Sequence, residues 1–177
     1  MKLAILLTLS LHPPIQNNDV VTKFFNAIST GDVAFVLEHC RDSKGYLSKN
    51  GFTPLMYSTQ LDKVEISRSL IHCGHDVNEA PNLLPTPLYF AAENGNRELV
   101  ELLLTKGANP NMPGGDAPLI VAAETGHLAI VKVLVEKGAN VNQFISGPVE
   151  NIRNALYLAK KNGHRQIVRF LKENGAN

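Results

Sequence analysis

A motif that opens with Thr-Pro-Leu and closes with Gly-Ala-Asn recurs along this 177-residue chain, and its spacing constrains the fold more than any other feature. Its clearest copy runs from Thr86-Pro87-Leu88 to Gly107-Ala108-Asn109. The four glycines in the closing position lie 33, 31 and 37 residues apart, and they are Gly74, Gly107, Gly138 and Gly175. A repeat of about 20 to 50 residues indicates that one supersecondary unit stacks on the next in a solenoid.

Capping residues predict two short helices in each repeat. Thr53-Pro54 and Thr86-Pro87 match a helix start, because the hydroxyl accepts a hydrogen bond from the first turn and proline fits the first helical position. Asn154 can cap the last repeat in the same way, whereas Ala117 cannot, so we expect a start there that is weaker by about 1 kcal/mol. A left-handed residue is expected to end the first helix, and the residues in that place are Asp62, Gly95, Gly126 and Gly163.

Apolar spacing predicts the second helix of each repeat. Residues 99–104 and 128–135 carry leucine, isoleucine and valine at helical spacing. The first helices contain the small pairs Ala91-Ala92 and Ala122-Ala123, which allow neighbouring helices to approach closely. One repeat cannot bury its apolar faces alone, so stability is expected to come from stacking.

Together these features resemble the ankyrin repeat, whose signature is a period near 33 residues with a turn and two helices. The resemblance implies an all-α ankyrin-repeat solenoid of about five helix-turn-helix repeats with projecting hairpin loops. We expect residues 1–18 to form an N-terminal apolar segment and linker, and residues 19–177 to form the repeat domain. The expected repeats are 19–47, 48–79, 80–112, 113–143 and 144–177, the outer two being atypical because one face of each meets solvent.

The resemblance implies a non-enzymatic module that binds a partner protein through its concave face and hairpin tips, with no cofactor. Alternatives are an exported ankyrin protein that acts as an effector or inhibits or protects a partner, and a scaffold tethered to a membrane by the apolar segment. The partner-binding residues carried over by position are Phe52, Gln60, Leu61, Leu83, Leu84, Tyr89, Glu93, Met112, Asp116, Glu124, Phe144 and Ile145. Large apolar tips suit interface anchors, although packing against a neighbouring hairpin is the alternative. Glu93 and Glu124 would favour a basic partner surface.

One polar position of the family is altered throughout this chain. Ankyrin repeats usually carry a histidine after Thr-Pro-Leu, which bonds to the threonine and links repeats. Here the position is occupied by Met56, Tyr89, Ile120 and Tyr157. We assign these four residues to the concave surface and expect the polar link to be missing and the array to be less rigid.

Composition bears on partners and location. The chain has 17 Lys and Arg against 16 Asp and Glu, which argues against nucleic-acid binding, and no apolar run is long enough to span a bilayer. Lys2 followed by the apolar residues 3–11 resembles a secretory signal with a poor cleavage region. The alternatives are a segment lying against the first repeat, or a misplaced start codon. A cytoplasmic monomer is favoured, with a secreted or periplasmic location if the segment is a signal peptide.

The two cysteines, Cys40 and Cys73, occupy equivalent positions near the ends of successive second helices. Packed helices lie about 8–10 Å apart, which exceeds the Cα separation of about 7 Å that a disulfide spans, so we predict two free thiols. Each cysteine follows a histidine directly rather than at a zinc-ligand spacing, and no metal site is predicted. The chain lacks the nucleophile-elbow, phosphate-loop, zinc-protease and dinucleotide motifs, so no enzyme is predicted.

Overall fold

The computed structural model describes residues 18–112, 117–145 and 153–177. Within these ranges ten α-helices form five consecutive pairs, which confirms the predicted all-α solenoid. The first helices of the pairs are α1 (Asn18–Thr30), α3 (Pro54–Gln60), α5 (Pro87–Glu93), α7 (Pro118–Thr125) and α9 (Ala155–Lys161). The second helices are α2 (Val33–His39), α4 (Val64–His72), α6 (Arg97–Thr105), α8 (Leu128–Glu136) and α10 (Arg165–Glu173).

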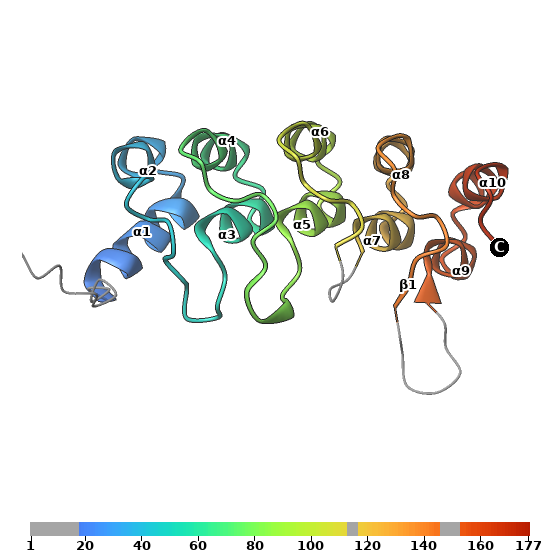
Figure 1. The fold of residues 1–177 in the computed structure, drawn as a ribbon, viewed down its shortest axis with the longest axis horizontal. Helices are drawn as coiled ribbons and strands as arrows, with labels where there is room; N and C mark the ends of the chain where they lie inside the picture. Colours follow the sequence, from blue (N-terminus) through green and yellow to red (C-terminus); the bar gives the residue numbers. More distant parts are fainter. Residues whose placement is uncertain (1–17, 113–116, 146–152) are drawn as a thin grey trace, which may run out of the picture.

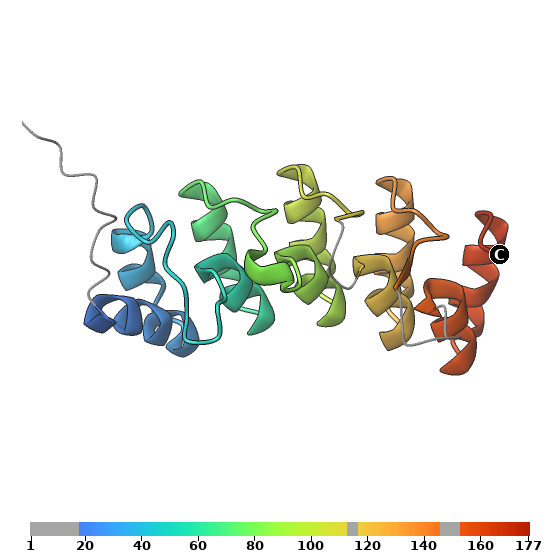
Figure 2. The same ribbon diagram turned by 60° about the horizontal axis from the view of Figure 1, so that its bottom comes forward.

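The helix pairs lie side by side in chain order, with the first helices in one row and the second helices in another (Figure 1, Figure 2). Each first helix packs against its own second helix, and α1, α3, α5 and α7 also pack against the first helix of the next pair. The loops that join successive pairs project beyond the row of first helices (Figure 1). The short 3-10 helix η1 (Pro81–Leu83) lies in the loop before α5, and β1 (Phe144–Ile145) pairs antiparallel with β2 (Arg153–Asn154) before α9.

The helix starts follow the predicted capping chemistry. The Thr53 and Thr86 hydroxyls each accept a hydrogen bond of 3.2 Å from the backbone N–H three residues later. Asn154 Oδ1 accepts one of 2.7 Å in the same way, and Ala117 provides no side-chain cap for α7. The predicted left-handed helix ends are also present, with a φ of +89° at Gly126 and +53° at Asp62. Glycine adopts that conformation without the steric penalty that a Cβ brings.

The core runs continuously through the array from α1 to α10. The alanine pairs 91–92 and 122–123 are completely buried between the first helices. Ser58 and Thr59 take the same places in the second pair and are also buried. Their hydroxyls are satisfied locally, since Ser58 Oγ lies 2.8 Å from Ser67 Oγ and Thr59 Oγ1 donates to the Leu55 carbonyl at 3.0 Å. The fit of the second repeat therefore depends on internal hydrogen bonds as well as on small side chains.

The assignment of the position after Thr-Pro-Leu to the concave surface is wrong for two of its four residues. Met56 is completely buried and Ile120 is only 2% exposed. A large apolar side chain at this position is removed from water, which is favourable, whereas the usual histidine would need a polar partner there. Tyr89 is half-buried and Tyr157 is exposed.

The prediction of two free thiols is also wrong, because Cys40 and Cys73 form a disulfide. Their Cα atoms lie 6.0 Å apart, within the range that a disulfide spans. The helix-packing distance that we used joins helix axes, whereas these residues are the C-caps of α2 and α4, and their Cα atoms lie closer together than helix axes do. The bond links the first helix pair covalently to the second.

Two further features concern only the described residues. Among them, no group of three or more His, Cys, Asp or Glu side chains could hold a metal ion. No helix in these ranges has the length and hydropathy needed to cross a bilayer. The apolar segment 3–11, and with it the signal-peptide and tether interpretations, falls outside these ranges, as does Asp116.

Candidate protein-binding surface

A ladder of asparagine side chains fixes the start of the projecting loops. Asn78, Asn111 and Asn142 each donate through Nδ2 to the carbonyl of the closing glycine in the next repeat, at 3.0, 2.8 and 3.1 Å. Each Oδ1 also accepts a backbone N–H from that repeat, at 2.8, 2.8 and 3.1 Å. Because each amide bridges two repeats through both of its polar atoms, the ladder sets the spacing of consecutive loops.

A second set of polar contacts links the ends of the first helices. Here side chains reach back to main-chain carbonyls of the preceding repeat. The contacts are Asn94 Nδ2 to Thr59 O at 2.8 Å, His127 Nε2 to Glu93 O at 3.1 Å, and His164 Nε2 to Glu124 O at 2.9 Å. The missing family histidine therefore does not leave these repeats without polar connections, and these replacements were not predicted from the sequence.

The tip of the loop before α5 presents an unusual leucine. Leu83 lies at the end of η1 and is 74% exposed, and both it and Asn82 have left-handed backbone conformations, with φ of +60° and +55°. A leucine in this region costs about 1–2 kcal/mol, whereas asparagine tolerates it better. An exposed leucine contributes little burial of apolar surface to offset that cost. The packing of the fold therefore gives no reason for a leucine at this position.

The other apolar tips differ in how far they are packed. The Phe52 ring stands edge-on to Phe90 of α5 with centroids 5.7 Å apart, so it is half-buried against the next repeat. Leu84 is half-buried beside the preceding loop, where a Cβ placed on Gly51 would lie 3.5 Å from Leu84 Cδ1. Met112 is also half-buried. These side chains offer a partner a smaller apolar surface than Leu83 does.

Phe144 is the second strongly exposed apolar residue among those predicted for the tips, and it lies in a strand. It is 61% exposed in β1, where its backbone pairs with Asn154. Ile145 pairs with Arg153 in the same short sheet, and its side chain is outside what the structure describes. Phe144 and Leu83 therefore mark two exposed apolar positions on loops that precede different first helices.

The two predicted acidic positions are in different environments. Glu93 is exposed and accepts a hydrogen bond of 3.4 Å from the Tyr89 hydroxyl. Glu124 forms an ion pair with Arg153, with 3.3 Å between Oε1 and Nη2. Gln60 and Leu61, at the end of α3, are both exposed.

A hollow of about 660 Å³ lies near the first helix pair and was missed by sequence reasoning. Val21 and Phe25 of α1, Leu47 and Lys49 of the following loop, and Tyr57 of α3 contribute to its lining. The Phe25 and Tyr57 rings meet edge-on at 5.4 Å. The first repeat lacks the Thr-Pro start that places residues in the other repeats, so the sequence carried no register from which to find this hollow.

Two titratable groups near the closing turn of the second repeat have shifted pKa values. Burial lowers the pKa of His75, against the effect of its Nε2 contact with the Cys40 carbonyl at 3.0 Å. Burial raises the pKa of Glu79, and the charge of Asp76 adds to this shift. His75 Nε2 also lies 3.1 Å from the buried Ser43 hydroxyl, so this histidine connects the first two repeats.

Comparisons with known proteins agree with this architecture. A family model described as ankyrin repeats in three copies matches residues 79–145, and a single ankyrin-repeat model matches residues 50–82. Mouse inversin is 42% identical over 59 residues, which is 33% of this chain and 6% of inversin. "Ankyrin repeat, SAM and basic leucine zipper domain-containing protein 1" of Carollia perspicillata is 33% identical over 107 residues, 57% of this chain and 22% of that protein.

An ankyrin repeat protein of fowlpox virus is 43% identical over 68 residues, or 37% of this chain and 23% of the viral protein. The chain thus spans less than a quarter of the length of each of these three relatives. Ankyrin repeats are generally modules for protein–protein interaction and are typically non-enzymatic. From its matched residues, its helix pairs and its closing turns, the chain belongs to the ankyrin-repeat family.

Proposed function

We propose that the chain binds a partner protein through its loop tips and the adjoining ends of its first helices. The observation that carries this proposal is Leu83, an exposed leucine at the tip of a projecting loop in an unfavourable backbone conformation. Phe144 adds an exposed aromatic ring on another loop. Large apolar and aromatic side chains that become desolvated on binding supply much of the affinity of protein interfaces.

The polar contacts between repeats support this proposal. The asparagine ladder holds the loops at a set spacing, and the contacts at the ends of the first helices do the same for the surface beside them. A surface that is already ordered loses less conformational entropy when it binds. The tips can therefore present their apolar side chains without a large ordering cost.

Acidic side chains add a preference for a partner with a basic surface. Glu93 is exposed and takes part in none of the ion pairs among the described residues, so it can meet a basic group of the partner. Glu124 is already paired with Arg153 and contributes less to this preference. We therefore expect Glu93 to affect the rate of association more than its strength.

A pair of substitutions tests the binding surface. We expect Leu83→Ser/Phe144→Ser to lose most partner binding in copurification from cells of the source organism, while circular dichroism stays unchanged. The matched control is Val20→Ser/Leu37→Ser, which removes two exposed apolar side chains from α1 and α2 instead. Unchanged binding by the tip variant, or equal loss in the control, would show that the tips are not the interface.

The disulfide favours a second candidate, an exported ankyrin protein that acts on a partner outside the cytosol. Disulfides persist in oxidising compartments and are rare in the cytosol. The intact mass of the protein from separated cell fractions tests this candidate. An oxidised mass in a non-cytosolic fraction supports export, and a reduced protein confined to the cytosol excludes it.

A further inference from the structure

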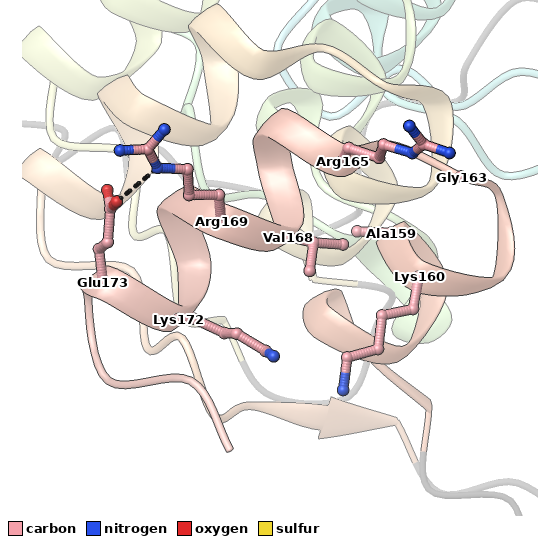
Figure 3. Close-up of a pocket in the computed structure, with 8 residues that line it drawn as sticks. All are labelled: Ala159, Lys160, Gly163, Arg165, Val168, Arg169, Lys172 and Glu173. Carbon is pink, nitrogen blue, oxygen red and sulfur yellow. Dashed lines mark hydrogen bonds and ion pairs between the residues drawn. The ribbon is translucent and has the colours of Figure 1, made fainter.

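The last helix pair has an open groove on its surface. This groove of about 560 Å³ lies between α9 and α10 (Figure 3). Ala159 and Val168 lie between the two helices, while Lys160 and Lys172 extend from α9 and α10 toward the same space (Figure 3). Arg165 also contributes to the lining. The groove thus combines an aliphatic centre with cations contributed by both helices.

These cations replace small or apolar side chains of the inner repeats. Counted from the helix starts, Lys160 occupies the place of three buried residues, which are Thr59, Ala92 and Ala123. Lys172 occupies the place of three apolar residues that belong to or pack against the core, which are Ile71, Leu104 and Val135. An apolar helix pair packed over this face would strip water from both ammonium groups at a high cost. The face therefore suits an occupant that brings opposite charge.

Charge is distributed unevenly along the chain. Residues 153–177 contain six Lys and Arg but a single acidic residue, Glu173, although the whole chain is nearly balanced at 17 against 16. Arg169 is paired with Glu173 at 2.8 Å. Lys160, Arg165 and Lys172 take part in none of the ion pairs of the described residues. Clustered cations of this kind create a positive potential that attracts anionic partners.

We propose that this groove binds an acidic segment of a partner protein. Carboxylates of the segment meet Lys160, Arg165 and Lys172, and an apolar side chain of the segment covers Ala159 and Val168. Single-stranded nucleic acid is the less fitting occupant, because the lining residues are aliphatic or charged and provide no platform for stacking bases. The groove is distinct from the loop tips, so this binding does not depend on the proposed tip interface.

Fluorescence anisotropy with a labelled peptide tests the proposal. The probe is the sequence Glu-Glu-Leu repeated four times, and Lys-Lys-Leu repeated four times is the peptide control. We expect the acidic peptide alone to bind, with Lys160→Glu/Lys172→Glu weakening it by about tenfold or more. The matched control Lys106→Glu/Lys137→Glu reverses two exposed lysines that cap α6 and α8, and we expect a change below about threefold there.

A second variant keeps the test decisive if charge reversal unfolds the last repeat. Lys160→Ala/Lys172→Val installs the side chains of the fourth repeat and should also weaken the acidic peptide. Carbodiimide cross-linking of the peptide should attach it to Lys160 or Lys172. Absence of binding to the unmodified protein, equal loss in the Lys106/Lys137 control, or attachment mainly elsewhere would overturn the proposal. Tighter binding of a twelve-nucleotide oligothymidine, lost in the same groove variants, would overturn it in favour of nucleic acid.

Discussion

The junction between the first two repeats and the junction between the third and fourth repeats use different interactions within one architecture. The former has the Cys40–Cys73 disulfide and the buried His75, which contacts Ser43 across the repeats. The latter has close alanine packing between α5 and α7 together with the Asn111 bridge. The stacking geometry of the backbone can therefore be stabilised either by covalent and buried polar links or by close apolar packing with surface amides.

His75 shows why the two junctions diverge. The closing turns of the third and fourth repeats place Ala108 and Ala139 where the second has His75, and all three are buried. A buried imidazole requires a hydrogen-bond partner, and the first repeat supplies Ser43 and the Cys40 carbonyl. A buried alanine side chain needs no hydrogen-bond partner. The first repeat is thus joined to the second through specific polar groups.

The largest expected effect that separates the junctions comes from the disulfide. Cys40→Ala/Cys73→Ala should lower the free energy of unfolding by about 3–4 kcal/mol, because the bond closes a loop of 33 residues in the unfolded chain. Urea unfolding followed by circular dichroism measures the loss. Reductant should destabilise the unmodified protein similarly and leave the variant unchanged. If reductant has no effect on the unmodified protein, the first junction does not depend on the bond.

Asn111→Ala tests the central junction in the same assay. We expect a loss of about 1–2 kcal/mol, because the substitution removes hydrogen bonds to Gly138 O and from Asn140 N at an exposed site. Asn111→Asp keeps the acceptor oxygen but sets a carboxylate oxygen against the Gly138 carbonyl in place of the amide donor, so it should lose at least as much. Equal stability of all three proteins would mean that apolar packing alone holds this junction.

Ala117→Thr should strengthen the fourth repeat. The start of α7 lacks a side-chain cap, whereas Thr53 and Thr86 are buried in the same place and cap their helices. We expect a gain of about 1 kcal/mol in the free energy of unfolding. The reverse change, Thr86→Ala, should cost a similar amount. A threonine at 117 that destabilises the protein would show that this site cannot accommodate the cap.

The smallest effect concerns pH at the first junction. Because the pKa of His75 is lowered by folding, the unfolded chain binds more protons as pH falls below its ordinary pKa of about 6.5. The histidine therefore leaves stability intact above that pH and reduces it as pH falls toward the lower pKa of the folded state. His75→Ala should flatten this decline in urea titrations and change stability at pH 7.5 by about 1 kcal/mol or less.

His127→Ala is the matched control for the pH measurement. It removes a histidine that contacts the Glu93 carbonyl at the second set of links, and it leaves His75 in place. We expect this variant to retain the decline in stability at low pH. If His75→Ala keeps the decline as well, another group is responsible for it.

Much of the candidate surface could be placed from the sequence, but its exposure could not. The repeat register put Phe52, Leu83 and Phe144 between helix pairs, where the structure has Leu83 in η1 and Phe144 in β1. Only the folded chain distinguishes the exposed Leu83 and Phe144 from Phe52, which packs against Phe90. The difference arises from contacts between repeats, which a local pattern does not contain. Their part in binding stays a prediction.

The sequence by itself determined the helix pairs, their caps and their closing turns. These features depend on residues a few positions apart, such as Thr86 and the N–H three residues later, and so they can be read locally. Tertiary structure alone decided the Cys40–Cys73 bond and the burial of Met56 and Ile120. Those outcomes depend on distances between side chains of packed helices, which the repeat period does not specify.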